Sequence, residues 1–274
     1  MKSTSRLTIL SSVLMFLLSF PATRAAESIY PDSVIPRGRA SDAPNWELGT
    51  IFRADLPGKI TQVRVFSLAE ESGDHQVRIW RNADNTVIAG PIKWTFGGEE
   101  AWITLDILDV AIQPDQDYTI AISTTADGWY PANGSYFLSA GNNGQNLVYP
   151  KAAGVFSATA GMRPTDSFNN AAYLRDIVFE TDLSGTVMRV KGNNFGVPDG
   201  STTSSAANGT DVGGKGVNSG TREQVLTIQN LGQTALQLTG SPPVAISGAQ
   251  AAEFVVSSQP SASVPGGGSA TFTV

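Results

Sequence analysis

The stretch that decides the fold is WELGTIFRADLPGKITQVRVF (46–66), in which Val63 and Val65 share one face of a strand and Arg64 lies on the other. The same alternation recurs in four further runs: HQVRIW (75–80), IKWTF (92–96), AWITLDI (101–107) and YTIAIS (118–123). A period of two is typical of antiparallel strands with one face toward solvent. Several such strands separated by Gly, Asn, Asp and Pro turns predict an all-β sandwich.

The N-terminus has the pattern of a removable export signal. Lys2 and Arg6 precede the apolar run LTILSSVLMFLLSF (7–20), and a small-residue site ending at Ala25 follows it. The run is shorter than the ~20 apolar residues that a membrane-spanning helix needs. We therefore expect residues 1–25 to be a signal peptide, the protein to be secreted or held at the cell surface, and no transmembrane helix to remain.

The charge and the cysteine count exclude several classes of function. The 274-residue chain carries 18 basic and 24 acidic residues, and loss of the signal would leave 15 basic ones and a net charge of −9. Binding of nucleic acid needs clustered Lys and Arg, so a nucleic-acid partner is excluded. The chain has no cysteine, so core burial must hold it without disulfides.

The composition divides the exported chain into a lead-in and two domains. Residues 26–45 contain three prolines and no period, and we interpret them as an extended lead-in to a first sandwich at 46–182. The second domain, 187–274, opens with a stretch rich in Gly, Ser and Asn. Four β-like runs follow in it: REQVLTIQN (222–230), TALQLTG (234–240), AAEFVVSSQP (251–260) and SATFTV (269–274). Four strands are too few to close a sandwich of about seven, so this domain is expected to be incomplete.

The first domain resembles a known bacterial family. The segments ELGTIFRADLPGKITQVRVF (47–66), GDHQVRIWRNADNTVIA (73–89), AWITLDILDVAIQPDQDYTIAIS (101–123) and YLRDIVFE (173–180) occur in the order and spacing of domain-of-unknown-function family 4082, which residues 46–180 resemble. The resemblance implies a jelly-roll-like antiparallel β-sandwich in secreted and cell-surface proteins, often beside glycoside-active or adhesive modules. It implies no established activity.

The second domain, 187–274, contains three segments that also follow a known pattern: VKGNNFGVPDGSTTSSAANGTDVG (190–213), TREQVLTIQNLGQTALQLTGSPPVAISGAQAAEFVV (221–256) and PGGGSATFTV (265–274). Through these residues the domain resembles the choice-of-anchor D domain, an immunoglobulin-like module of the Hydin type that is common in bacterial surface proteins. The resemblance implies that the Gly/Ser stretch forms a first strand and long ordered loops. It also implies further strands beyond Val274, so we expect this sequence to be a fragment of a longer protein.

The inventory of catalytic residues is small. With one histidine and no cysteine, thiolate nucleophiles and multi-histidine zinc sites are excluded. A serine triad could use only His75, and because no G-x-S-x-G elbow is present we expect a structural histidine that hydrogen-bonds a loop. A hydrolase needs only two facing carboxylates, and the candidates are Glu70, Glu71, Glu99, Glu100, Asp106 and Asp109. The glutamate pairs stand beside glycines in predicted loops, where solvated charge is the usual content.

Two places could bind a ligand. In ADGWYPANGSYF (126–137), Trp129, Tyr130 and Tyr136 stand near Asn133, and aromatic faces with nearby amides suit a sugar. The alternative is that Trp129 and Tyr130 plug the end of the sandwich.

The second place is Asp176, which lies inside the strand YLRDIVFE (173–180) and needs a partner there. That partner is an arginine or a backbone group, or else Asp176 is a ligand of a calcium ion. Calcium is the one cofactor that the sequence suggests.

We interpret the protein as a non-catalytic, bacterial, secreted or cell-surface module. It would bind an extracellular or cell-wall polysaccharide, or space and present other domains of a longer chain. One alternative is an accessory module of a larger secreted glycoside-active enzyme. A second is a hydrolase that uses a carboxylate pair of the first sandwich.

Overall fold

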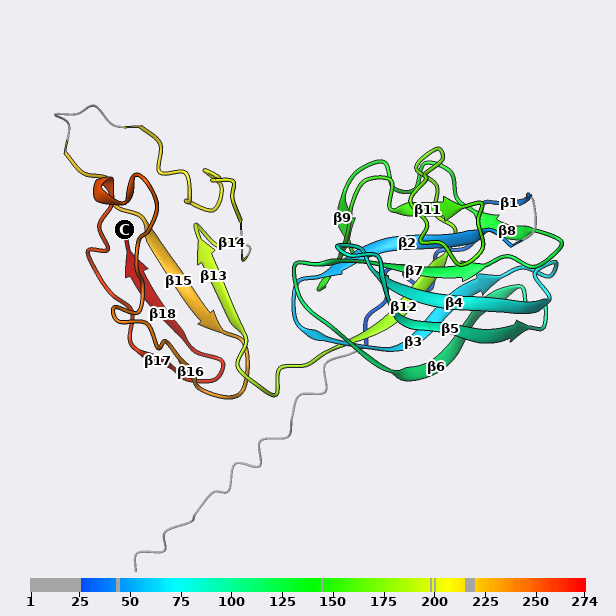
Figure 1. The fold of residues 1–274 in the computed structure, drawn as a ribbon, viewed down its shortest axis with the longest axis horizontal. Coiled ribbons are helices and arrows are strands. Elements are labelled where there is room, and N and C mark those ends of the chain that lie inside the picture. Colours follow the sequence, from blue (N-terminus) through cyan, green and yellow to red (C-terminus); the bar gives the residue numbers. More distant parts are fainter. Residues whose placement is uncertain (1–25, 43–44, 144, 198, 200, 215–219) are drawn as a thin grey trace, which may run out of the picture.

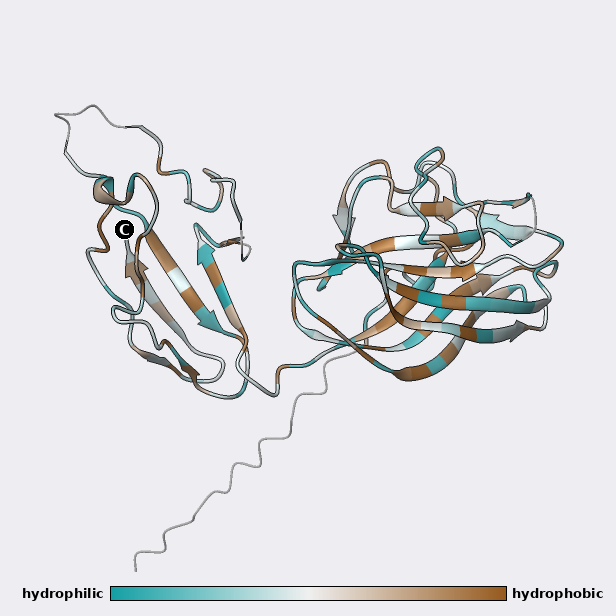
Figure 2. Ribbon diagram, viewed as in Figure 1, coloured by the Kyte–Doolittle hydropathy of each residue, from teal (hydrophilic) through white to brown (hydrophobic). Residues whose placement is uncertain are grey.

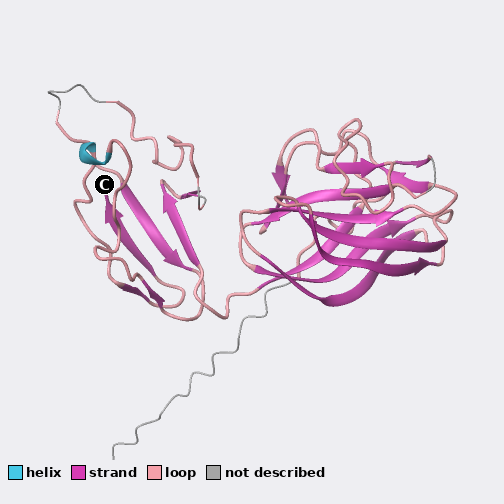
Figure 3. Cartoon of the chain, viewed as in Figure 1, coloured by secondary structure: helices cyan, strands magenta, loops and turns pink. Residues whose placement is uncertain are grey.

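The computed structural model describes residues 26–42, 45–143, 145–197, 199, 201–214 and 220–274 (Figure 1). The predicted signal peptide lies outside the described residues. Within them the protein consists of strands and loops, apart from one 3-10 turn, η1 (Ala251–Glu253) (Figure 3). The prediction of an all-β fold is therefore confirmed.

The larger sheet of the first sandwich has the strand order β5-β4-β7-β2-β10-β9, and β11 also pairs with β2. All of these pairings are antiparallel. The strands are β2 (Glu47–Ala54), β4 (Gly73–Arg81), β5 (Thr86–Phe96), β7 (Asp117–Ser123), β9 (Gly141–Asn142), β10 (Leu147–Tyr149) and β11 (Gly154–Ser157).

The smaller sheet has the order β12-β3-β6, with β12 (Arg175–Thr181), β3 (Gly58–Ser67) and β6 (Ala101–Ile112). Its register places Arg175 opposite Val65 and Asp176 opposite Arg64. Directly paired residues project from the same face of a sheet. Arg175 therefore shares the core face with Val65, and Asp176 shares the outer face with Arg64.

The core lies between these two sheets, where the alternating apolar positions meet (Figure 2). Its fully buried members include Phe52, Ile60, Val63, Val65, Ile120, Ile177 and Phe179. Trp80 and Ile79 are both buried, at 7% and 0% exposure. The register of β4 with β7 is regular through these two residues, so their side chains point to opposite faces: Ile79 belongs to the core between the sheets, and Trp80 is buried on the other face.

The lead-in is part of the sandwich. Glu27 and Phe179 exchange two backbone hydrogen bonds at the edge of β12, of 2.8 and 2.7 Å. The next residues, Ile29 and Tyr30, are buried in the core, at 2% and 1% exposure. Farther along, β1 (Gly38–Ser41) pairs with β8 (Trp129–Ala132) to form a two-stranded ribbon.

The second unit is also all-β. Its main sheet has the order β14-β13-β15-β18, and a short ladder joins β16 to β17. The strands are β13 (Met188–Gly192), β14 (Phe195–Val197), β15 (Val225–Asn230), β16 (Leu236–Gln237), β17 (Ser263–Val264) and β18 (Ser269–Thr273). The prediction of a strand at 251–260 is wrong: a 3-10 turn occupies the start of this segment, and among its described residues only a single bridge, at Ser258, follows.

The core of this second unit is small. Among its described residues, the buried apolar side chains are Ile228, Pro260, Val264 and Phe272. Asn230 is fully buried, and its amide donates to the carbonyls of Thr234 and Val264 at 2.8 and 3.0 Å. In the described part of the chain, no helix is long and apolar enough to cross a membrane.

Candidate functional site

The loop singled out by its aromatics begins in β8, where successive side chains point to opposite faces. Tyr130 is 7% exposed and packs against Leu48 and Tyr173, with its ring centroid 5.7 Å from that of Tyr173. Its hydroxyl donates to the Asp42 carboxylate, and burial raises the pKa of that hydroxyl. Trp129 stays partly exposed. Tyr130 thus plugs the end of the sandwich, and Trp129 keeps part of its surface in solvent. A binding role for Trp129 stays a prediction.

Two other candidates of this loop make internal contacts. Asn133 is 2% exposed: its side-chain oxygen accepts the Arg37 N–H at 2.5 Å, and its amide donates to the Ile35 carbonyl at 3.0 Å. Asn133 therefore clamps the lead-in. Tyr136 is half-buried, with its ring centroid 5.5 Å from that of Tyr30. A binding role for these two residues stays a prediction.

The same loop lies beside a second loop that the sequence did not single out. Asn133 and Ala172 exchange two backbone hydrogen bonds, of 2.9 and 3.0 Å. We call the segments 133–138 and 166–172 the loop pair. The second segment carries Phe168, which is 71% exposed. A phenylalanine between polar residues in a loop, as in TDSFNN, was the signal that could have found it.

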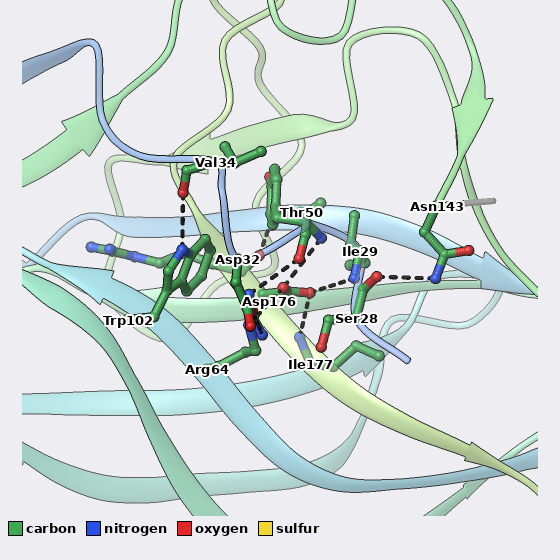
Figure 4. Close-up of polar contacts among 12 residues, drawn as sticks. Ser28, Ile29, Asp32, Val34, Thr50, Arg64, Trp102, Asn143, Asp176 and Ile177 are labelled. Atoms are coloured by element: carbon green, nitrogen blue, oxygen red, sulfur yellow. Dashed lines mark hydrogen bonds and ion pairs between the residues drawn. The ribbon is translucent and has the colours of Figure 1, made fainter. Parts of the chain in front are cut away.

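Asp176 anchors the lead-in to the outer face of the smaller sheet (Figure 4). It is fully buried, and its carboxylate accepts hydrogen bonds from the backbone N–H groups of Ile29 at 2.8 Å, Tyr30 at 3.3 Å and Ile177 at 2.8 Å. The Arg64 guanidinium lies 3.0 Å from it. Burial raises the pKa of Asp176 to about 7, and the Arg64 charge opposes that rise. Of the partners predicted for Asp176, an arginine and backbone N–H groups are the ones observed.

Arg64 links Asp176 to the lead-in residues that follow Tyr30. Its guanidinium binds the Asp32 carboxylate at 2.7 Å and donates to the Tyr30 carbonyl at 3.1 Å. It also stacks over the Trp102 ring, 4.2 Å from the centroid. The Trp102 indole N–H in turn donates to the Val34 carbonyl at 2.9 Å (Figure 4). The polar groups of this cluster therefore hold the lead-in in place.

The prediction that Asp176 binds calcium needs further oxygen ligands near its carboxylate. In the described part of the chain, no group of three or more His, Cys, Asp or Glu residues could hold a metal ion. Calcium takes six to eight oxygen ligands, whereas the oxygens of Asp176 already accept N–H donors. The calcium role stays a prediction that no described ligand set supports.

A second buried polar cluster lies between the sheets. Arg175 and Glu71 are both fully buried and form an ion pair of 2.5 Å, and burial raises the pKa of Glu71. His75 is fully buried as well, with its Nδ1 2.6 Å from the Ser123 carbonyl and its ring 3.7 Å from that of Phe96. Burial lowers the pKa of His75 to about 4, so the ring is neutral. Its Nε2 lies 3.3 Å from the Glu71 carbonyl, and the shorter contact of Nδ1 favours the tautomer in which Nδ1–H donates. Neither Glu71 nor His75 can reach an external substrate.

The exposed acids also have partners. Arg39 binds both Glu70 and Glu100, at 2.7 Å each. Its hydrogen bond lowers the pKa of Glu70, the opposite of the raised pKa that a general acid needs. The other three candidates, Glu99, Asp106 and Asp109, bond respectively to the Gly97 N–H, to Gln62 and to Lys59. Of the six candidate carboxylates, Glu71 has a raised pKa but is buried, whereas the partly exposed Glu70 has a lowered pKa.

Residues 33–175 match the family described as Domain of unknown function (DUF4082), which is just over half of the chain. The chain belongs to this family. No curated protein matches it. The matched DUF4082 region holds β1 to β11 and ends at the first residue of β12. It therefore contains the ribbon and the loop pair, whereas Asp176 and the second unit lie beyond it.

Proposed function

We propose that the DUF4082 domain of this chain is a non-catalytic, exported module that binds an extracellular or cell-wall polysaccharide. The observation that carries the proposal is the contrast between its charged and its aromatic residues. The candidate acids and the histidine are engaged in internal contacts, while Trp129 stays partly exposed on the β1–β8 ribbon. Aromatic rings accept the apolar face of a sugar without needing a titratable group.

The charge of the chain favours a neutral polymer. The net charge is −6 for the whole chain and −9 without residues 1–25. A surface of this sign repels polyanions, including acidic polysaccharides and anionic lipid. The same argument disfavours nucleic acid as a partner.

The second unit fits a role in which it holds the DUF4082 domain away from other parts of a longer protein. We infer that residues 187–274 form an immunoglobulin-like module of the choice-of-anchor D type, which would space the DUF4082 domain from other parts of a longer surface protein. Its all-β sheet and its small core accord with a module that packs against further strands. The polysaccharide would then be bound by the first unit alone.

The test uses residues 26–274 and the Trp129→Ala and Trp129→Phe variants. We expect the parent chain to bind at least one neutral polymer in a pull-down and glycan-array panel, without releasing reducing ends. Trp129→Ala should weaken that binding, and Trp129→Phe should retain most of it, because an aromatic face remains. Release of reducing ends that is abolished in Glu70→Gln would replace this proposal with the hydrolase alternative. Binding to no polymer of the panel would leave the role of a spacer.

A further inference from the structure

Phe168 differs from the other aromatic residues of the first sandwich. Among the described residues 26–182 it is the most exposed aromatic side chain, at 71%, whereas the remaining rings are buried or half-buried. A phenylalanine held in water contributes nothing to the core. Burying such a ring against a ligand removes apolar surface from water at about 25 cal/mol per Å². Its exposure is therefore a property that a ligand can use.

The backbone that carries Phe168 is tightly fixed. The Ala171 N–H donates to the Phe168 carbonyl at 3.0 Å, and between them Asn169 and Asn170 have φ values of 49° and 47°. Two successive left-handed residues define a type I′ turn, and asparagine is one of the few residues that tolerate this conformation. The turn therefore keeps its shape although the Phe168 side chain is largely exposed.

The other half of the loop pair holds this turn from the side. The Ser135 and Phe137 N–H groups donate to the carbonyls of Asn169 and Asn170, at 2.9 Å each. A ligand that binds the turn does not have to order it first, and such preorganisation favours affinity.

Two polar side chains lie on the loop pair next to Phe168 in sequence or bonded through the backbone to its neighbour. Asn169 and Ser135 are both exposed, and neither side chain makes a hydrogen bond within the described part of the chain. The Asn169 amide lies over Gly134, where an added Cβ would be 2.9 Å from Nδ2. The glycine thus lets the amide approach the backbone of the opposite loop. An amide and a hydroxyl offer donors and acceptors of the kind that sugar hydroxyls need.

We propose that Phe168, Asn169 and Ser135 form a subsite for one ring of a neutral polysaccharide. This inference rests on the proposed function and names where the polymer is held. Phe168 stacks on the apolar face of the sugar, and Asn169 and Ser135 hydrogen-bond its hydroxyls. The exposed Asp166 on the same loop disfavours uronic and sulfated sugars at this position.

The experiment measures binding of residues 26–274 to soluble neutral glucans, xylans and mannans, and to polyuronate, by affinity electrophoresis and calorimetry. Aromatic stacking of about 0.5–1.5 kcal/mol predicts a loss of roughly 2- to 13-fold in affinity for Phe168→Ala. Phe168→Trp should bind as well as the parent or better. Gly134→Ala should weaken binding by displacing the Asn169 amide. The matched control is Phe195→Ala, which removes a ring of 60% exposure from β14 and should change nothing.

The outcomes separate the subsite from the function on which it rests. Loss in Phe168→Ala with retention in Phe168→Trp and Phe195→Ala supports the subsite. Unchanged binding in Phe168→Ala together with loss in Trp129→Ala overturns the subsite and leaves the function in place. Preference for the polyuronate overturns the neutral ligand class. If the parent chain binds no polymer, the proposed function fails and the subsite fails with it.

Discussion

Replacing Asp176 by alanine tests whether the lead-in is held by a single buried carboxylate. The change removes the acceptor of the Ile29 and Tyr30 N–H groups and the buried carboxylate that lies 3.0 Å from the Arg64 guanidinium. Removing one partner of a buried pair costs about 3–5 kcal/mol. Arg64 keeps its contacts to Asp32 and to a carbonyl, so we expect about 4 kcal/mol rather than the upper limit, measured below pH 7 because the contribution of Asp176 is lost above its raised pKa.

The loss should be visible as a shift in the unfolding of the first unit. A domain of 150–250 residues changes its Tm by about 2–4 °C per kcal/mol, so Asp176→Ala should melt roughly 8–16 °C lower. All five tryptophans lie between Trp46 and Trp129, so their fluorescence in urea reports on this unit alone. Amide exchange at Ile29 and Tyr30 should accelerate more than exchange in β3.

Asp109→Ala is the matched control, since Asp109 lies on the same sheet in β6 and pairs with Lys59 at 2.7 Å, but is 56% exposed. Exposed pairs contribute little to stability, so its urea midpoint should stay near that of the parent. The reasoning is refuted if Asp176→Ala unfolds at the same midpoint as Asp109→Ala. That result would mean that the lead-in is held by packing of Tyr30 and not by the carboxylate.

Two further predictions concern pH and backbone crowding. The pKa of Asp176 is about 7 in the folded protein and ordinarily 3.8, so the contribution of Asp176 to stability is lost as pH rises through 7. The pKa of His75 is about 4 in the folded protein and ordinarily 6.5, so the contribution of His75 to stability is lost as pH falls through 4. The two slopes oppose each other, so between about pH 4 and 6.5 the unfolding free energy should rise with pH in Asp176→Asn and fall in His75→Gln, as urea titrations at several pH values would measure. Gly154→Ala places a Cβ 1.8 Å from the Ala171 carbonyl oxygen and should destabilise by about 3 kcal/mol. Gly38→Ala in the same unit, whose Cβ would come no closer than 3.4 Å to the Ala132 carbonyl oxygen, should unfold like the parent in the same assay.

The strands of the first sandwich were predictable because alternation along one strand suffices to define them. Val63 and Val65 are buried and Arg64 is not, as their parity predicts. The parity of Asp176 against Ile177 also predicted that this acid needs a partner. Which arginine or amide supplies that partner depends on strand register, and alternation within one strand carries no information about register.

The features that sequence analysis missed depend on contacts between distant segments. The lead-in has no period, yet Tyr30 is buried because its hydroxyl reaches Thr50, 20 residues away, at 2.9 Å. The run 251–260 is rich in apolar residues, but Phe254 and Val255 are exposed, at 45% and 70%, because no sheet partner covers them among the described residues. Phe168 was missed because exposure is a property of the fold and not of the residue type.

The positions of the polar clusters separate stability from binding in this molecule. Asp176 and the pair of Glu71 with Arg175 are fully buried. Asp176 holds the lead-in through the Ile29 N–H, and Glu71 holds the loop after β3 through the Leu68 N–H. Phe168 and Asn169 lie outside both clusters and are held by backbone hydrogen bonds of the loop pair. A change of either exposed side chain should therefore alter affinity without altering the urea midpoint. Removal of a buried acid should lower the midpoint and reduce binding only as far as the loop pair unfolds.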